Sequence, residues 1–266
     1  MGRNDLCFCM SGKKKKICHP DIHEESQAAA KLKIYSELEY NFKTHRQTAN
    51  GISLCVPGCS DCCFDYFTIQ SIEFDLILNE LAKWDEEKLN NLIKRVDKYW
   101  VMMENEYPEA TKLLLNANDN DIEKINSSIE KTSFPCVFHD VTTQLCQIYD
   151  FRPFKCRIFG TTYHIPEMEE DAVGIACHRY GSILNDDNFD VILCDVTELL
   201  NKNTDLSVIH HKKRNIAVLS PQYPLIYHLY QHFIVKKLGV SIVNFDEKFK
   251  KPRSTYCNTI INKIVR

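Results

Sequence analysis

Four thiols fall within nine residues in the stretch Cys55-Val56-Pro57-Gly58-Cys59-Ser60-Asp61-Cys62-Cys63, which contains a Pro-Gly turn. A tight turn can aim several sulfur atoms at one point, and a tetrahedral metal site requires that arrangement. A second set of thiols follows later in the chain, at Cys136, Cys146, Cys156 and Cys177. We expect the two sets to close around metal or an iron–sulfur cluster and to hold together a mostly helical domain.

The overall composition is that of an ordinary soluble globular protein. The chain has 266 residues, of which 44% are hydrophobic and 26% charged, and its formal net charge is -3. Such a balance gives no global attraction to nucleic acid or to a membrane surface. No run is long and apolar enough for a membrane span, and the first residues lack the apolar segment of a signal peptide. We therefore expect a cytoplasmic protein with no membrane partner and no specific nucleic-acid partner.

The thirteen cysteines favour metal binding over a disulfide framework. Disulfide frameworks are typical of secreted chains, in which cysteines pair in even numbers. Here the number is odd, the cysteines come in clusters, and no export signal is recognisable. Metal binding accounts for these three features together.

A third group of potential ligands lies within residues 1–20. Cys7, Cys9, Cys18 and His19 form a C-x-C pair followed, eight residues later, by Cys-His. Three cysteines and one histidine are a common ligand set for structural zinc. A segment this short cannot build a hydrophobic core, so metal binding would supply its folding free energy.

Residues 3–20 resemble the SEC-C motif, the zinc-binding tail of the SecA translocation ATPase. The Arg-Asn-Asp start, the C-x-C pair, the Ser-Gly-Lys-Lys run and the Cys-His pair all match this motif. Leu6 replaces the usual proline, and Met10 replaces the usual glycine after the second cysteine. The resemblance implies a Zn²⁺-binding docking module that contacts the ribosome or proteins of the secretion and chaperone machinery.

The remaining sequence predicts a mainly α fold, an irregular helical domain with one short hairpin and a small N-terminal zinc knuckle. Apolar residues at helical spacing predict a helix over residues 21–48, with Ala28, Leu32, Tyr35, Leu38 and Phe42 on its buried face. Further helices are predicted after residue 71, from residue 85 to a break at 108, and over 188–202 and 221–239. A hairpin is predicted around 140–144, and a helical turn over 150–157.

These expectations divide the chain into four parts. Residues 1–20 form the knuckle, 21–49 a helical linker, 50–180 the cysteine-cluster domain, and 181–266 a helical part packed on that same domain.

Residues 50–180 resemble the YkgJ-type cysteine-cluster proteins, which are described as zinc- or iron-chelating. The likeness rests on the Cys-x₃-Cys-x₂-Cys-Cys turn, the Cys-x-Ile-Tyr segment and the Arg-Pro-x-x-Cys-Arg run. It implies eight metal ligands, which are Cys55, Cys59, Cys62, Cys63, Cys136, Cys146, Cys156 and Cys177. Arg152 and Arg157 flank Cys156, and we expect these cations to stabilise thiolates bound to the metal or cluster.

The metal content remains open at this level. Side chains of neighbouring residues usually point apart, so Cys62 and Cys63 would serve different ions, or one of them would stay free. Eight thiols allow two Cys₄ zinc sites, a four-iron cluster plus a zinc ion, or one site with redox-active spare thiols.

Three functions fit these motifs. The first is a metal-binding cysteine-cluster protein with a docking knuckle. The second is a protein lysine N-methyltransferase that uses S-adenosylmethionine and an iron–sulfur cluster, because flagellin lysine-N-methylases resemble the same family and radical enzymes use the Cys-x₃-Cys-x₂-Cys spacing. The third is an adaptor for the ribosome or secretion machinery. The sequence lacks the alternating strand–helix pattern of a radical-enzyme barrel, so the first function is preferred.

Overall fold

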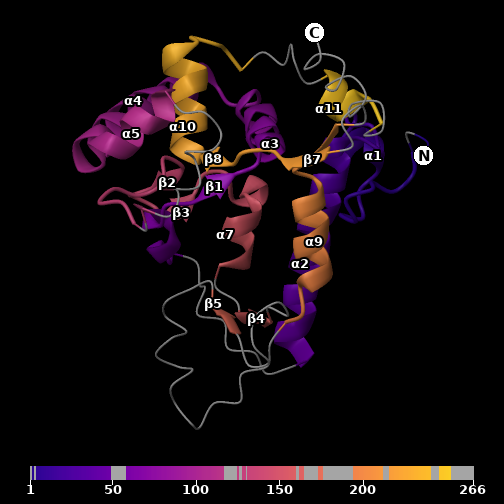
Figure 1. The fold of residues 1–266 in the computed structure, drawn as a ribbon. Coiled ribbons are helices and arrows are strands. Elements are labelled where there is room, and N and C mark those ends of the chain that lie inside the picture. The colour runs from indigo at the N-terminus through magenta and orange to yellow at the C-terminus, as the bar shows by residue number, and fades with distance from the viewer. Residues whose placement is uncertain are drawn as a thin grey trace. The chain divides into compact units, whose positions relative to one another are not determined.

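The computed structural model describes residues 2, 4–48, 58–116, 125, 128–129, 131–159, 162–164, 173–175, 194–211, 216–240 and 246–252. The fold of this part is mainly helical, which confirms the predicted class (Figure 1). The helices are α1 (Lys15–Cys18), α2 (Gln27–Thr48), η1 (Asp61–Phe64), α3 (Ser71–Leu81), α4 (Glu86–Glu106), α5 (Pro108–Asn116), η2 (Tyr149–Phe151), α7 (Phe154–Ile158), α9 (Thr197–Asp205), α10 (Leu225–Tyr230), η3 (Gln231–Val235) and α11 (Asp246–Lys250).

Strands in the described part of the chain form two-stranded antiparallel pairs. The pairs are β1 (Thr68–Ile69) with β8 (Tyr223–Pro224), β2 (His139–Asp140) with β3 (Leu145–Cys146), β4 (Thr162–His164) with β5 (Val173–Ile175), and β6 (Val208–His211) with β7 (Ile216–Leu219).

The chain divides into two compact units, each built from segments that are distant in the sequence. The knuckle unit consists of Met1–Val56, Arg157–Ser220 and Asn244–Arg266, and the central unit consists of Pro57–Cys156 and Pro221–Val243. The predicted parts, by contrast, follow one another along the chain, and their boundaries stay a prediction.

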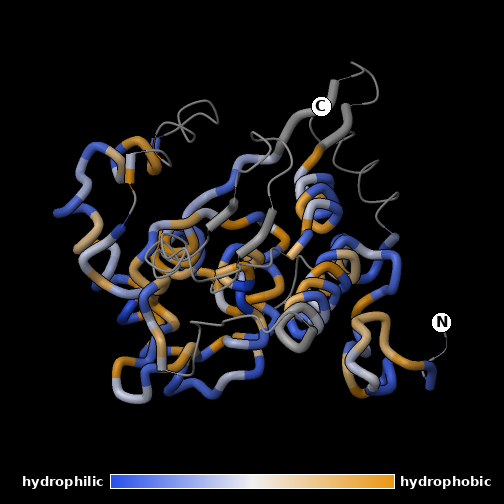
Figure 2. The backbone as a smooth tube through the Cα atoms, turned by 90° about the horizontal axis from the view of Figure 1, so that it is seen from below, coloured by the Kyte–Doolittle hydropathy of each residue, from blue (hydrophilic) through white to orange (hydrophobic). Residues whose placement is uncertain are grey.

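In the knuckle unit, α2 buries one face against α9 and α11. All five apolar residues predicted for that face are buried: Ala28, Leu32, Tyr35, Leu38 and Phe42. Polar contacts border this face, since the Gln27 side chain donates to the Leu206 carbonyl at 3.1 Å. Figure 2 shows hydrophobic and hydrophilic residues alternating along the helices, as expected when one face of each helix is buried.

In the central unit, α4 packs against α5 and α10. Its first residue follows Asp85, whose carboxylate accepts the Lys88 N–H at 2.7 Å and so caps the helix. Pro108 begins α5, because proline fits the first turn of a helix but not its interior. Trp100 of α4 stacks on Tyr230 of α10 with their ring centroids 4.2 Å apart, and this contact helps to hold α10 against α4.

Two details in the C-terminal third differ from the sequence-based expectation. The helix predicted over 188–202 begins at Thr197 in α9, and residues 188–193 lie outside the described residues. The helix predicted over 221–239 is shorter, because residues 223–224 pair with β1 instead and the helical segment runs from α10 through the π-helical η3 to Val235.

Candidate metal centres

The four predicted knuckle ligands lie together in the structure. Their ligand atoms all lie within 4.8 Å of one another, and they belong to Cys7, Cys9, Cys18 and His19. The Cys7 Sγ is 3.2 Å from the His19 Nδ1, and the Cys9 Sγ is 3.5 Å from the Cys18 Sγ. Tetrahedral zinc with zinc–sulfur bonds of about 2.3 Å separates its sulfur ligands by roughly 3.8 Å. The observed spacing therefore suits one zinc ion.

The backbone of the knuckle explains how so short a segment gathers four ligands. Leu6 and Lys14 form an antiparallel bridge, which turns the chain back on itself around the C-x-C pair. The reversal uses two residues in the left-handed region, Gly12 with φ 73° and Met10 with φ 57°. Met10 bears a side chain, so its left-handed conformation costs about 1–2 kcal/mol.

The thiols of the knuckle differ in acidity. Burial raises the pKa of Cys7 to about 12, and the neighbouring Cys9 and Cys18 thiols add to this effect. Burial also acts to raise the pKa of Cys9, but hydrogen bonds from Ser11 and from the other thiols outweigh it and lower the pKa. Cys9 therefore ionises more readily than Cys7, and a bound cation would favour the thiolate form of both.

The two sets of cysteines meet in the central unit through main-chain hydrogen bonds. The Cys136 N–H donates to the Cys63 carbonyl at 2.6 Å, and the Thr132 N–H donates to the Phe64 carbonyl at 2.8 Å. The Ser60 hydroxyl also donates to the Gln144 side chain in the hairpin turn, at 3.3 Å. The cysteine turn around η1 thus lies against the segment that leads into β2.

Four thiols from three segments interact electrostatically in this place: Cys62, Cys136, Cys146 and Cys156. Burial raises the pKa of Cys136 to about 12, with further contributions from the Cys146 and Cys62 thiolates. Burial also raises the pKa of Cys156 well above its usual value, and the other three thiols add to it. A hydrogen bond that the Cys62 thiol donates to Cys63 raises the pKa of Cys62, and burial raises it further. Cys62, Cys136 and Cys156 thus resist ionisation in the metal-free protein, and a bound cation would stabilise their thiolates.

The spacing of the central thiols is wider than that of the knuckle. Among the described residues, only the knuckle ligands form a group of three or more whose donor atoms all lie within 4.8 Å of one another. The described central cysteines form no such group. The central sulfur atoms would therefore have to approach one another to share a single zinc ion. A polynuclear centre, in which each thiolate binds its own metal atom, tolerates a wider spacing.

A buried carboxylate holds Cys156 in this arrangement. The Glu73 side chain in the first turn of α3 accepts the Gln70 N–H at 2.9 Å and the Phe154 N–H at 2.7 Å. Phe154 is the first residue of α7, and Cys156 lies two residues further along that helix. Glu73 therefore connects the start of α3 to the start of α7.

Two arginines place positive charge beside the central thiols. Arg152, which was predicted for this role, acts to lower the pKa of both Cys62 and Cys156. Arg95 of α4, which the sequence analysis missed, acts in the same direction on Cys136 and donates to the Gln147 side chain at 3.1 Å. The two arginines together offset part of the thiolate charge at Cys62, Cys136 and Cys156.

Arg157, the other predicted cation, makes its described contacts within the knuckle unit. Its guanidinium bonds to the Glu39 carboxylate at 2.9 Å and lies over the Tyr35 ring, 4.2 Å from the centroid. The role predicted for Arg157 at a metal centre stays a prediction.

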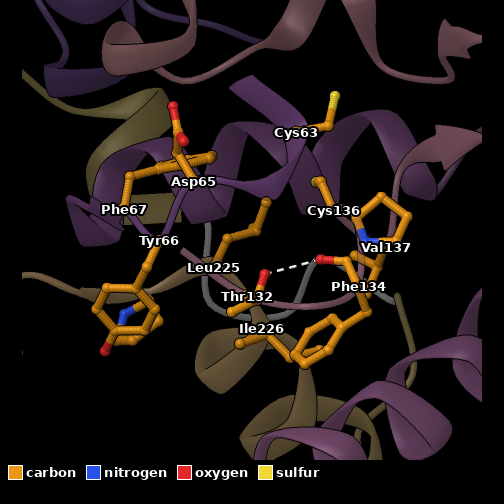
Figure 3. Close-up of a pocket in the computed structure, with 12 residues that line it drawn as sticks. Cys63, Asp65, Tyr66, Phe67, Thr132, Phe134, Cys136, Val137, Leu225 and Ile226 are labelled. Carbon is orange, nitrogen blue, oxygen red and sulfur yellow. Dashed lines mark hydrogen bonds between the residues drawn. The ribbon is translucent and has the colours of Figure 1, made fainter. Parts of the chain in front are cut away.

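Cys63 borders a small apolar pocket next to the central thiols (Figure 3). The pocket has a volume of about 50 Å³, and its lining includes Phe134, Leu225 and Ile226. Its wall is fixed by the Thr132 hydroxyl, which donates to the Phe134 carbonyl at 2.7 Å. In Figure 3 the Cys63 sulfur points away from these apolar side chains.

The remaining predicted ligands are placed only in part. Cys59 is partly buried and lies just before η1, near the Cys62–Cys63 pair in the chain. Cys55 and Cys177 lie outside the described residues. Whether Cys55, Cys59, Cys63 and Cys177 act as ligands stays a prediction.

Comparison with known proteins supports metal binding by the cysteine cluster. Residues 54–178 match the family model CxxCxxCC, described as "Putative zinc- or iron-chelating domain". Comparisons with curated proteins and with solved structures found no match. None of the helices in the described part combines the length and the apolar character needed to cross a bilayer. The family match and the Cys₃His geometry of the knuckle thus both indicate metal binding.

Proposed function

We propose that the chain is a metal-binding protein whose central unit holds zinc or a four-iron cluster through its cysteines. The main support is that Cys62, Cys136, Cys146 and Cys156 interact with one another although they come from three segments. The proposed ligands are these four together with Cys55, Cys59, Cys63 and Cys177. We also propose that the knuckle binds one Zn²⁺ through its three cysteines and His19.

The donor chemistry supports both metals at the central centre. Thiolates bind zinc and iron–sulfur clusters alike. The wide spacing of the sulfur atoms favours a polynuclear centre, whereas the approach of four sulfurs to one ion would favour zinc. A brown protein that contains iron and sulfide would identify a cluster, and a colourless protein with zinc alone would identify structural zinc.

The test is metal and sulfide analysis of the protein purified without oxygen, with two matched serine variants. Cys156→Ser removes a proposed central ligand, and we expect it to lower the metal content and the stability. Cys194→Ser is the control, because Cys194 is another buried thiol, near Asp195 in the knuckle unit. If Cys156→Ser retains the same metal content and stability as Cys194→Ser, the central centre is wrongly assigned.

A docking role for the knuckle is supported by its surface. Leu6, Met10 and Ile17 are 65%, 57% and 69% exposed, an unusual concentration of apolar side chains on so short a segment. We propose that this surface contacts the ribosome or a protein of the secretion and chaperone machinery. Co-sedimentation with ribosomes that is lost in Leu6→Ser/Ile17→Ser, with zinc still bound, would support ribosome docking. Equal sedimentation of both proteins would contradict it.

The lysine methylase alternative receives no support from the comparisons or from the described residues. The strands of this part form two-stranded antiparallel pairs, which differ from the parallel strands of a strand–helix barrel. Metal binding with a docking knuckle is therefore the preferred function. The expected cytoplasmic location stays a prediction.

A further inference from the structure

His139 is a buried residue of the central unit whose side chain has no evident role in the fold. The residue is 4% exposed, and neither its Nδ1 nor its Nε2 has a hydrogen-bond partner among the described residues. A neutral imidazole carries one donor and one acceptor, and native proteins rarely bury both without a partner. A bound metal ion is one explanation for buried ring nitrogens that have no hydrogen-bond partner in the protein.

The position of His139 in the chain is that of a metal ligand. Its N–H donates to the Cys136 carbonyl at 2.9 Å, so the segment from Cys136 to His139 forms a tight turn. Two residues separate this cysteine from the histidine, which is a spacing that zinc sites use between successive ligands.

The hairpin adds a second proposed ligand to the same place. His139 lies directly opposite Cys146 in the β2–β3 ladder. Residues directly opposite in an antiparallel pair point to the same face, with their Cβ atoms about 4.5–5.5 Å apart. Cys146 in turn interacts electrostatically with Cys136 and Cys156. His139 therefore has Cys136 three residues before it in the chain and Cys146 opposite it in the hairpin.

We propose that His139 binds the metal of the central centre through a ring nitrogen, alongside Cys136 and Cys146. This inference rests on the proposed metal-binding function. Imidazole binds as a neutral ligand, so it adds a bond without adding thiolate charge to a place that already gathers several thiols. Bond formation needs the donor atoms to approach one another, because within the described residues only the knuckle set of three or more ligands falls within 4.8 Å.

The experiment uses the full chain with Cys9→Ser/Cys18→Ser, which leaves the knuckle only Cys7 and His19 and so disables its four-ligand site. After zinc is added, X-ray absorption measures the zinc–ligand distances, and competition titration measures the zinc affinity. Both are compared between this parent and the parent with His139→Leu. We expect the parent to show a zinc–nitrogen distance of about 2.0–2.1 Å beside zinc–sulfur at about 2.3 Å. His139→Leu should lose the nitrogen component and at least about tenfold in zinc affinity, while the metal-free protein unfolds at the same or a higher denaturant concentration.

Two further variants make the result decisive. His228→Leu is the matched control, since it removes an imidazole of the same unit that stacks on Phe74 with 4.9 Å between ring centroids. It should keep the nitrogen component and the zinc affinity. If His139→Leu does not fold, His139→Cys replaces the nitrogen by another ligand, and we expect it to bind zinc through sulfur alone.

The outcomes separate this inference from the proposed function. A parent that binds zinc with a nitrogen component unchanged in His139→Leu or His139→Cys overturns the role of His139 and leaves the central centre standing. A parent that binds neither zinc nor iron overturns both.

Discussion

Replacing Glu73 by Gln tests the contact that holds Cys156 in place. The Glu73 residue is 4% exposed, and its two carboxylate oxygens accept the N–H groups of Gln70 and Phe154 at 2.9 and 2.7 Å. Hydrogen bonds to a charged group contribute about 1.5–3 kcal/mol each, and glutamine keeps only one acceptor oxygen. Its NH₂ group would face a second donor, so we expect the free energy of unfolding to fall by about 2–4 kcal/mol.

The assay is urea unfolding of the metal-free protein, followed by tryptophan fluorescence. Both tryptophans of the chain, Trp84 and Trp100, lie in the central unit, so the signal reports on the unit that contains Glu73. The control is Glu80→Gln on the same helix, which removes the charge of a partly exposed ion pair with Lys83 and should cost less than about 1 kcal/mol.

Zinc affinity provides a second measurement on the same variant. We expect the affinity of the central thiols to fall in Glu73→Gln, because the helix that bears Cys156 loses its anchor. If Glu73→Gln unfolds at the same urea concentration as Glu80→Gln, the carboxylate does not fasten α7 and the reasoning is refuted.

Three further predictions concern the knuckle, the pH and Arg157. Met10→Gly should raise the zinc affinity of the knuckle at least about fivefold, because glycine adopts the left-handed conformation at φ 57° without the steric cost of about 1–2 kcal/mol. The metal-free protein should lose stability as the pH rises from about 9 to about 12, because the folded state raises the pKa of Cys136 from 9.0 to about 12 and so holds this proton more tightly than the unfolded chain. Arg157→Gln should lower the free energy of unfolding by about 1–2 kcal/mol through lost contacts with Glu39 and Tyr35.

Each of these predictions has its own control. Gly12→Ala should weaken zinc binding by the knuckle, since it adds a side chain at φ 73°. Urea midpoints under reducing conditions test the pH effect, and an equal slope in Cys136→Ser would contradict the assignment to this thiol. The metal content of the central centre in Arg157→Gln tests the role predicted for Arg157. A loss of metal as large as that in Arg152→Gln would show that Arg157 acts at the metal centre.

The local features of the fold follow from the sequence because their causes are local. The buried stripe of α2 obeys helical spacing, the helix α4 begins after the capping Asp85, and the four knuckle ligands lie within one short segment. The hairpin of β2 and β3 was likewise predicted from two apolar pieces separated by polar residues. In each case a few neighbouring residues determine the structure.

Features that depend on distant pairing could not be read from the sequence in the same way. The β1–β8 ladder joins Thr68 to Pro224, and no pattern in either segment specifies the other. Arg95 was missed because a single cation on an amphipathic helix normally faces solvent. His139 was missed because its significance lies in its burial without a partner, which only the folded structure reveals. The β6–β7 pair did carry a local signal, since β-branched residues recur in both strands, but the sequence analysis did not predict it.

The most direct test of the central claim is the native mass of the full chain with Cys9→Ser/Cys18→Ser, prepared without oxygen and measured before and after acid denaturation. Because the knuckle is disabled, any bound metal must reside elsewhere in the chain. We predict that the folded protein carries the additional mass of zinc or of a four-iron cluster, and that adding Cys136→Ser and Cys156→Ser removes it. A folded chain with the same mass before and after denaturation would contradict the proposal that these distant cysteines share a metal centre.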